Sequence, residues 1–318
     1  MSRIASPFAA LLAVGSLLAA VSIFAQSENQ PGQGQAVLTV VPNKNAPAPT
    51  LTAQQMNIKV DGKESNIANL KPFGPDSRVE LAILIDGASR TSLGNQFSDI
   101  EHFVQALPPN TRAALAYMEN GRAEFTGPFS ADRADTLRGL RLTGMGVPGI
   151  SASPYFCLAD LANHWPSNDR SARREVVMIT DGVDYYDLRY DPEDPYVQTA
   201  INQSVRAHLI VFTIYWRNEG RIDRSWYETD AGQNLLFQVT GATGGNSYWQ
   251  GLGNPVSLQP YLEDIGRRLG NQYELSFLAP SSGRTEVETF KLKAEVSGAK
   301  IDAPQEVLVL GSEMANER

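Results

Sequence analysis

Cysteine and histidine are scarce in this chain of 318 residues, which contains one cysteine and three histidines. The single cysteine, Cys157, excludes an intramolecular disulfide and a Cys-x-x-Cys zinc pattern, and no His-Glu-x-x-His motif is present. Cys157 stands in the apolar stretch YFCLADLA, so we expect a buried core thiol there. A disulfide scaffold and a zinc enzyme are both disfavoured.

Positive charge is also in short supply. The 27 basic residues are outnumbered by 35 acidic residues, the net charge is −8, and no run of four bases occurs. Because phosphate contacts need clustered lysine and arginine, nucleic acid is disfavoured as a partner. Hydrophobic residues make up 42% of the chain and charged residues 19%, which predicts a folded protein with a sizeable core.

The usual signatures of catalysis are missing as well. The GATGG run at 241–245 lacks the Lys-Ser/Thr of a phosphate loop and follows a predicted helix, so it is typical of a helix stop and turn. No Gly-x-Ser-x-Gly motif is present, and Ser89, His102 and Asp181 do not form a credible hydrolase triad. We therefore expect a protein that is not an enzyme.

The first 25 residues read as a secretory signal peptide. Arg3 is followed by a charge-free run from Phe8 to Ala25, after which the chain becomes polar. We expect cleavage after Ala25 and a periplasmic or secreted protein. An uncleaved membrane anchor is the alternative, because the run has the minimum length for a membrane span. No other segment is apolar enough to span a membrane.

The rest of the chain divides by its pattern of polarity. Residues 26–35 resemble a flexible spacer, and 36–77 contain strand-like pieces. Strand-like and helix-like stretches alternate over 78–270, which predicts a doubly wound, mostly parallel α/β sheet. Residues 271–318 return to strands with period-two polarity. Because neither end carries enough apolar surface alone, we expect both to form one small antiparallel β-module.

Acidic residues end two of the buried strands in the alternating region. The strand VELAILID ends at Asp86, and a later strand ends at Thr180-Asp181-Gly182. Ligands of open α/β sheets bind at the carboxyl ends of the strands. Two carboxylates with hydroxyl groups between them are typical of a site for a hard divalent cation such as Mg²⁺.

These segments resemble a known family. LAILIDGAS, VVMITDGVD and ATGGNSYW occur in the order found in the von Willebrand factor A domain, and the resemblance covers about 78–270. The flanking strands are similar to those of exported bacterial proteins with this domain. The resemblance implies a doubly wound fold and a metal ion-dependent adhesion site, built from Asp-x-Ser-x-Ser, a threonine on a second loop and a later aspartate.

This chain matches only some of the residues of that metal site. Asp86 and Asp181 match the two aspartates, and Ser153 is the better match for the loop threonine, with Ser151 as the alternative. Ala88 and Arg90 replace the two serines of the motif. The resemblance therefore implies a degenerate metal site at Asp86, Ser153 and Asp181, with weak or absent Mg²⁺ binding.

Two compensations for the lost serines remain open. Ser89 or Ser92 could supply a missing oxygen if the loop bulges. In the other, Arg90 pairs with Asp86 or Asp181 and replaces the metal.

The segment that follows Asp181 is a candidate recognition loop. Residues 181–195 hold six acids, one arginine and three tyrosines. Since tyrosine and arginine are enriched at interfaces, partner contacts are expected there, although a solvated loop is the competing interpretation. The candidate partner-binding residues are Asp184, Tyr185, Tyr186 and Asp187.

Together these observations favour an exported, non-enzymatic module that binds a protein partner at the carboxyl edge of its sheet. Two alternatives remain open: a structural envelope component with a vestigial site, and a metal-dependent hydrolase on a doubly wound fold.

Overall fold

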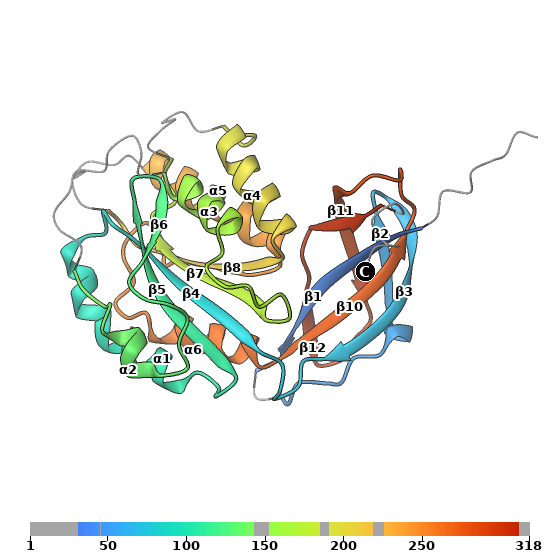
Figure 1. The fold of residues 1–318 in the computed structure, drawn as a ribbon, viewed down its shortest axis with the longest axis horizontal. Helices are drawn as coiled ribbons and strands as arrows, with labels where there is room; N and C mark the ends of the chain where they lie inside the picture. Colours follow the sequence, from blue (N-terminus) through green and yellow to red (C-terminus); the bar gives the residue numbers. More distant parts are fainter. Residues whose placement is uncertain (1–30, 45, 143–152, 185–190, 219–225, 312–318) are drawn as a thin grey trace, which may run out of the picture.

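A computed structural model describes residues 31–44, 46–142, 153–184, 191–218 and 226–311. The chain forms an α/β domain and a β-module that lie side by side (Figure 1). The α/β domain contains a six-stranded sheet in the order β6-β5-β4-β7-β8-β9. Neighbouring strands are parallel except β6, which runs antiparallel to β5. The strands are β4 (Val79–Asp86), β5 (Thr111–Glu119), β6 (Arg122–Phe125), β7 (Arg173–Thr180), β8 (Leu209–Tyr215) and β9 (Ser247–Tyr248).

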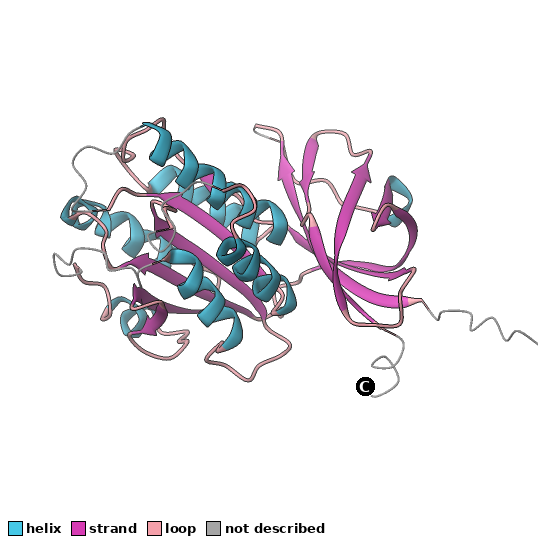
Figure 2. Cartoon of the chain, turned by 90° about the horizontal axis from the view of Figure 1, so that it is seen from above, coloured by secondary structure: helices cyan, strands magenta, loops and turns pink. Residues whose placement is uncertain are grey.

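Helices cover both faces of this sheet (Figure 2). Residues of α3, α4 and α5 share one core cluster, and residues of α1, α2 and α6 pack into the cluster on the other face. The mixed α/β class predicted from the sequence is confirmed. The helices are α1 (Phe97–Ala106), α2 (Arg133–Leu137), α3 (Pro154–Asn163), α4 (Pro195–Arg206), α5 (Trp226–Thr243) and α6 (Gln259–Leu269), with a 3-10 helix η2 (Thr91–Gln96) before α1.

Local sequence accounts for these elements. Every residue of β4 is buried, as expected for an apolar strand between two helical layers. Prolines begin α3 and α4, and the preceding Ser153 and Asp194 accept hydrogen bonds from the first-turn amides. Helix α5 ends at the predicted glycine run. There Gly245 passes so close to the carbonyl oxygen of Val211 that a Cβ atom would lie 1.8 Å from it, which explains the glycine.

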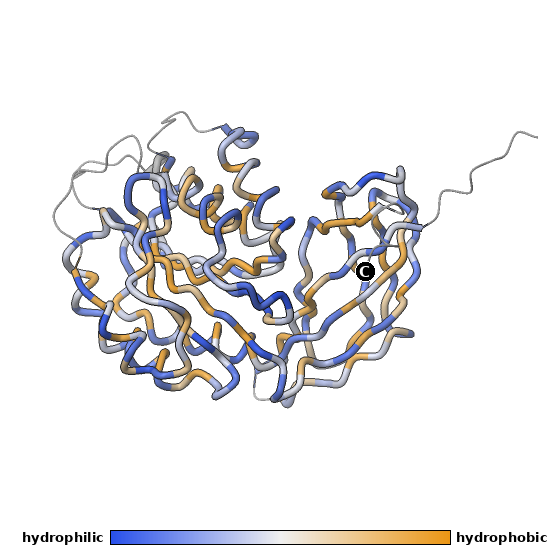
Figure 3. The backbone as a smooth tube through the Cα atoms, in the orientation of Figure 1, coloured by the Kyte–Doolittle hydropathy of each residue, from blue (hydrophilic) through white to orange (hydrophobic). Residues whose placement is uncertain are grey.

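The β-module is one antiparallel sheet built from both ends of the described chain. Its order is β10-β3-β2-β11-β13-β1-β12, and β1 also pairs with β10, so the sheet closes on itself. Buried apolar side chains of β1, β2, β10, β11 and β13 form its core cluster, and hydrophobic and hydrophilic positions are interspersed along its strands (Figure 3). The strands are β1 (Gly32–Pro42), β2 (Met56–Val60), β3 (Lys63–Pro72), β10 (Gln272–Ala279), β11 (Glu286–Ala294), β12 (Ala299–Asp302) and β13 (Glu306–Leu310), and a 3-10 helix η1 (Ala53–Gln55) precedes β2.

Several boundaries differ from the sequence prediction. Residues 32–35, expected in a flexible spacer, belong to β1 and pair with β10, because alternate positions there are buried. Strands β2 and β3 form a hairpin that turns at Asp61 and Gly62, both with positive φ. In the stretch 131–142, only the five residues of α2 are helical. Among the described residues, no helix combines the length and apolarity needed to cross a membrane.

One ion pair and one cation–π contact join the two parts of the molecule. Arg268 on α6 contacts Asp302 on β12 at 2.7 Å, and it also contacts Asp264 of its own helix at 2.7 Å. Arg173 at the start of β7 pairs with Glu175 at 2.8 Å and stacks on the ring of Phe73, which follows β3. The β-module is therefore fixed to the α/β domain by charged groups as well as by packing.

Candidate functional site

Asp86 and Asp181 lie at the carboxyl ends of two neighbouring parallel strands. Strands β4 and β7 pair in register up to Ile85 and Ile179, so Asp86 ends one strand and Asp181 follows the end of the other. Both side chains are buried. The sheet therefore brings together the two carboxylates that the sequence singled out.

Asp86 is held by three donors from different segments. Its Oδ1 accepts from the amide of Ala88 at 2.9 Å, as in an Asx turn. Its Oδ2 accepts from the Thr180 hydroxyl at 2.7 Å and from the Asn218 side-chain amide at 3.1 Å. These contacts join the ends of β4 and β7 to the segment that follows β8.

Neutral donors do not cancel the charge of this carboxylate. Burial raises the pKa of Asp86 from 3.8 to about 6, and the nearby Asp181 acts in the same direction, against the three hydrogen bonds. The carboxylate of Asp181 accepts from the amide of Val183 at 3.1 Å. The ionised site therefore destabilises the fold at neutral pH.

The candidate serines occupy different environments. Ser89 is buried, and its hydroxyl oxygen has no hydrogen-bond partner in the part of the chain that the structure describes. Ser92 lies on η2, and its side chain is exposed to solvent. Ser153 is buried at the start of α3, where it accepts from the amide of Tyr155 at 3.3 Å. Ser151 falls outside the described residues.

The start of α3 packs against the loop that carries Asp181. The Tyr155 hydroxyl donates to the carbonyl of Gly182 at 2.6 Å. Burial raises the Tyr155 pKa well above 10.0, and the charges of Asp184 and Asp181 add to this effect. Ser153 and Asp181 thus belong to segments in direct contact.

The predicted ion pair of Arg90 with Asp86 or Asp181 is wrong. Arg90 donates from Nε to the carbonyl of Asn218 at 3.2 Å, and its amide donates to the carbonyl of Arg217 at 3.2 Å. The loop after β4 runs beside the segment after β8, and this pairing directs Arg90 along that segment. Among the described residues, no ion pair joins Arg90 to either carboxylate.

The donor set fits a divalent cation only in part. Asp86, Asp181 and the unpartnered Ser89 hydroxyl are hard oxygen ligands of the kind Mg²⁺ prefers. Position 88 offers no side-chain oxygen, and the two oxygens of Asp86 already accept three hydrogen bonds. Within the described ranges, no three His, Cys, Asp or Glu residues gather at one point. We therefore derive no step through a metal.

The expected recognition loop falls mainly outside the described residues. Tyr185, Tyr186 and Asp187 all lie in the segment 185–190, which the structure does not describe. Asp184 is described, and its side chain is buried next to Tyr155. In this conformation Asp184 is a buried neighbour of the site and is not displayed on the surface.

An exposed apolar loop borders the same edge of the sheet. Strand β9 is parallel to β8, so the residues after Tyr248 leave from the carboxyl edge. Trp249, Leu252 and Val256 on this loop are 40%, 51% and 88% exposed, and we call them the apolar rim. The Arg217 amide donates to Asn254 at 2.7 Å, which ties the rim loop to the segment carrying Asn218.

Sequence reasoning missed Asn218 and the apolar rim. Asn218 closely follows the buried strand HLIVFTIYW, and the rule that located Asp86 and Asp181 would have located it too. The rim has no such signal, because the exposure of an apolar residue in a loop is decided by tertiary packing.

Comparison with known proteins gives fold likenesses only. No family model and no curated protein matches the chain. Among solved structures, the hypothetical protein BatB from Bacteroides thetaiotaomicron is 13% identical with a TM-score of 0.42, over 60% of this chain and 97% of that one. The VWA domain of SpRpn10 is 10% identical with a TM-score of 0.36, over 59% and 95%.

A third similar structure is proximal thread matrix protein 1 from the mussel byssus, described as having a zinc-occupied MIDAS motif. It is 12% identical with a TM-score of 0.39, and the match covers 63% of this chain and 47% of that protein. The similar structures thus include a von Willebrand A domain.

Proposed function

We propose that this chain is an exported, von Willebrand factor A-like module that binds another protein at the carboxyl edge of its parallel sheet and catalyses no reaction. The observation that supports this proposal is that two features lie together at the carboxyl edge of the sheet. A buried polar site around Asp86 and Asp181 lies beside an apolar rim that is open to solvent.

The energetics of the edge support a binding role. Asp86 keeps a carboxylate where burial and Asp181 oppose its charge, so a fold selected for stability alone would favour a neutral residue. Exposed large apolar side chains beside such a site are typical of protein contacts. A partner would cover the rim and place a donor or a cation near the carboxylates.

Among the described residues of the polar site, none forms a nucleophile with its base. The hydroxyl of Thr180 donates to a carboxylate, and Ser89 has no general base among the described residues. We therefore propose binding without chemistry. Export is proposed from the charge-free run at 8–25, which lies outside the described residues.

We propose that the wild type binds Mg²⁺ weakly or not at all, and that the two lost serines are the cause. The double variant Ala88→Ser with Arg90→Ser should bind Mg²⁺ at least about tenfold more tightly than the wild type, because it supplies two more oxygen ligands. Isothermal titration calorimetry with Mg²⁺ would measure this. Ser92→Ala is the matched control and should leave affinity unchanged. Tight Mg²⁺ binding by the wild type would contradict the proposal.

Photo-crosslinking tests the protein-binding edge. A photoreactive amino acid at position 252 should give one discrete adduct with another protein in the native cells, identified by mass spectrometry. Trp249→Ala should reduce that adduct by about tenfold, since exposed aromatic anchors carry much of an interface's energy. Phe237→Ala is the control, because Phe237 is 55% exposed on α5 and lies outside the rim. An adduct equally sensitive to both substitutions would refute the edge assignment.

A further inference from the structure

A second charged surface lies at the opposite, amino edge of the same sheet. Strands β5, β4 and β7 pair in register so that Arg112, Glu80 and Arg174 stand side by side. Residues in register on parallel strands point to the same face, so the three side chains form one row. Next along the same face come Ala114, Ala82 and Val176, which are part of the core shared with α3, α4 and α5. The row therefore marks the point where this core meets the amino edge.

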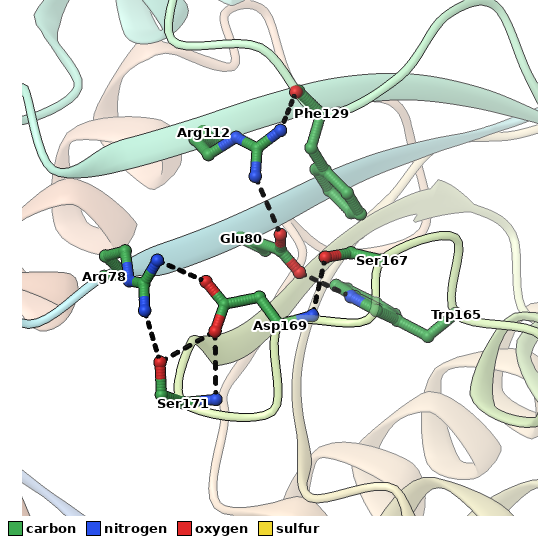
Figure 4. Close-up of polar contacts among 8 residues, drawn as sticks. All are labelled: Arg78, Glu80, Arg112, Phe129, Trp165, Ser167, Asp169 and Ser171. Atoms are coloured by element: carbon green, nitrogen blue, oxygen red, sulfur yellow. Dashed lines mark hydrogen bonds and ion pairs between the residues drawn. The ribbon is translucent and has the colours of Figure 1, made fainter.

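Two arginines at this edge, Arg112 and Arg78, already contact acidic side chains (Figure 4). Arg112 contacts the buried Glu80 at 3.5 Å and donates to the carbonyl of Phe129 at 2.8 Å. Arg78 pairs with Asp169 at 2.9 Å and donates to the Ser171 hydroxyl at 2.7 Å. The second oxygen of Glu80 accepts from the indole of Trp165 at 2.8 Å. Glu80 and Asp169 thus each already have a cationic partner.

The other two arginines, Arg170 and Arg174, make no ion pair with an acidic side chain among the described residues. Arg174 places its guanidinium over the ring of Trp165, 5.4 Å from the centroid, and it makes no hydrogen bond or ion pair with any described residue. Arg170 is exposed on the hydrophilic loop that leads into β7 (Figure 3), and it likewise has no such contact in the described ranges. Burial is the main cause that lowers the pKa of Arg174. The positive charge of Arg170 lowers this pKa further, and the negative charge of Glu80 raises it.

The charge balance of this edge is opposite to that of the whole chain. The arginine edge, defined as Arg78, Arg112, Arg170 and Arg174, sets four guanidiniums against the two carboxylates of Glu80 and Asp169. The result is an excess of two positive charges in a protein whose net charge is −8. Two guanidiniums of like charge held near each other are stabilised when an anion binds between them.

We propose that Arg170 and Arg174 form a binding site for the carboxylates of an acidic protein segment. A guanidinium fork matches a carboxylate with two parallel hydrogen bonds. Stacking on Trp165 fixes Arg174 in advance, which reduces the entropy lost on binding. The site is independent of the carboxyl edge and would give the protein a second point of contact.

The neighbouring groups favour carboxylate over other anions. Glu80 and Asp169 both act on Arg174, so a dianionic phosphate would meet more repulsion than a carboxylate with a single charge. An excess of two charges on an acidic protein is too small for nucleic acid, which needs an extended basic surface. The face of Trp165 is covered by Arg174 and by Phe129, which stacks on it at 5.0 Å, so the ring offers no platform for a base.

The test uses the full chain and a capped hexaglutamate peptide, with affinity measured by calorimetry at low salt. Arg170→Gln with Arg174→Gln should weaken binding at least about tenfold, whereas Arg284→Gln, the same charge change on the β10–β11 turn, should leave it within about twofold. Arg174→Lys should weaken it by about threefold or more, because lysine keeps the charge but loses the fork.

Other outcomes would overturn the assignment. It fails if hexaglutamate does not bind the wild type, or if Arg284→Gln costs as much as the double substitution. The protein could also bind inorganic phosphate, or vesicles rich in phosphatidylglycerol, more tightly than the peptide. That result would show that the site's ligand is a phosphate and not a carboxylate. Should the double variant not fold, Arg170→Gln alone decides the question, because Arg170 is exposed and makes no hydrogen bond or ion pair with a described residue.

Discussion

Replacing Arg268 with alanine should lower the free energy of unfolding by about 3–5 kcal/mol, the usual cost of removing one partner from a buried ion pair. Arg268 is only 7% exposed and stands between two carboxylates, Asp264 and Asp302, at 2.7 Å from each. Tyr248 donates its hydroxyl to the same oxygen of Asp264 at 2.7 Å. Without the guanidinium, both acids would lose their one buried cation and keep only exposed ones, Arg267 for Asp264 and Lys300 for Asp302.

The adjacent arginine is a matched control for this experiment. Arg267 contacts Asp264 at 3.0 Å, but 63% of its side chain is exposed, so Arg267→Ala should cost less than about 1 kcal/mol. Urea unfolding of both variants measures the difference. A combined Arg268→Met, Asp264→Asn and Asp302→Asn variant should recover most of the loss, because it removes the uncompensated charges.

The same substitution should loosen the contact between the two parts of the molecule. Asp302 belongs to β12 of the β-module, while Arg268, Asp264 and Tyr248 belong to the α/β domain. Hydrogen exchange should therefore accelerate at β12 and at its partner residues in β1 more than at the central strand β4. Equal stability of the Arg268→Ala and Arg267→Ala variants would show that this network does not stabilise the fold.

Short-range patterns were enough to predict most of the α/β domain from the sequence. Strands such as VELAILID carry continuous apolar runs, and residues at spacings of three and four mark α1 and α6. Closure of the β-module could not be read in this way, because the pairing of β1 with β10 joins residues more than 200 positions apart. Gly32 and Gly34 begin β1 without any β propensity, and Phe277 packs over Gly34.

The candidate site was predictable at its carboxylates and not at their partners. Asp86 and Asp181 follow recognisable strands, and parallel pairing forces such ends to the same edge. The role of Arg90 was mispredicted, because sequence proximity suggested a carboxylate partner while the loop pairing with 217–218 supplies a backbone carbonyl. The arginine edge shows only when the registers of three strands are aligned, since Glu80, Arg112 and Arg174 are far apart in the chain.

Replacing Asp86 with asparagine should stabilise the fold at neutral pH by about 2–3 kcal/mol, although it alters the centre of the proposed site. The folded state raises the pKa of Asp86 from 3.8 to about 6. Each pKa unit corresponds to about 1.4 kcal/mol, so the ionised form costs the folded protein about 3 kcal/mol above pH 6. Asparagine removes this cost and keeps an oxygen that accepts from the amide of Ala88. Its amide group faces Thr180, whose hydroxyl can accept as well as donate, and Asn218, whose side-chain amide must turn so that its oxygen accepts.

The pH dependence of stability shows whether the Asp86 carboxylate causes the effect. Because the folded pKa of Asp86 is raised, the folded state binds more protons than the unfolded chain between pH 3.8 and about 6, and wild-type stability falls as the pH rises through this window. Burial also raises the pKa of Glu175, from 4.5 to about 7, which adds a loss of the same sign in both proteins. The difference between wild type and Asp86→Asn therefore isolates Asp86.

Urea unfolding between about pH 4 and pH 8 in the presence of a chelator measures both curves, with the exposed Asp76→Asn as the control. The curves should converge near pH 4 and separate by about 2–3 kcal/mol above pH 6, while Asp76→Asn follows the wild type. A variant less stable than the wild type at neutral pH when Mg²⁺ replaces the chelator would mean that the native protein neutralises the Asp86 carboxylate with a cation. In that case Mg²⁺ binding, with the Ser89 hydroxyl as a ligand, would replace the metal-free site proposed here.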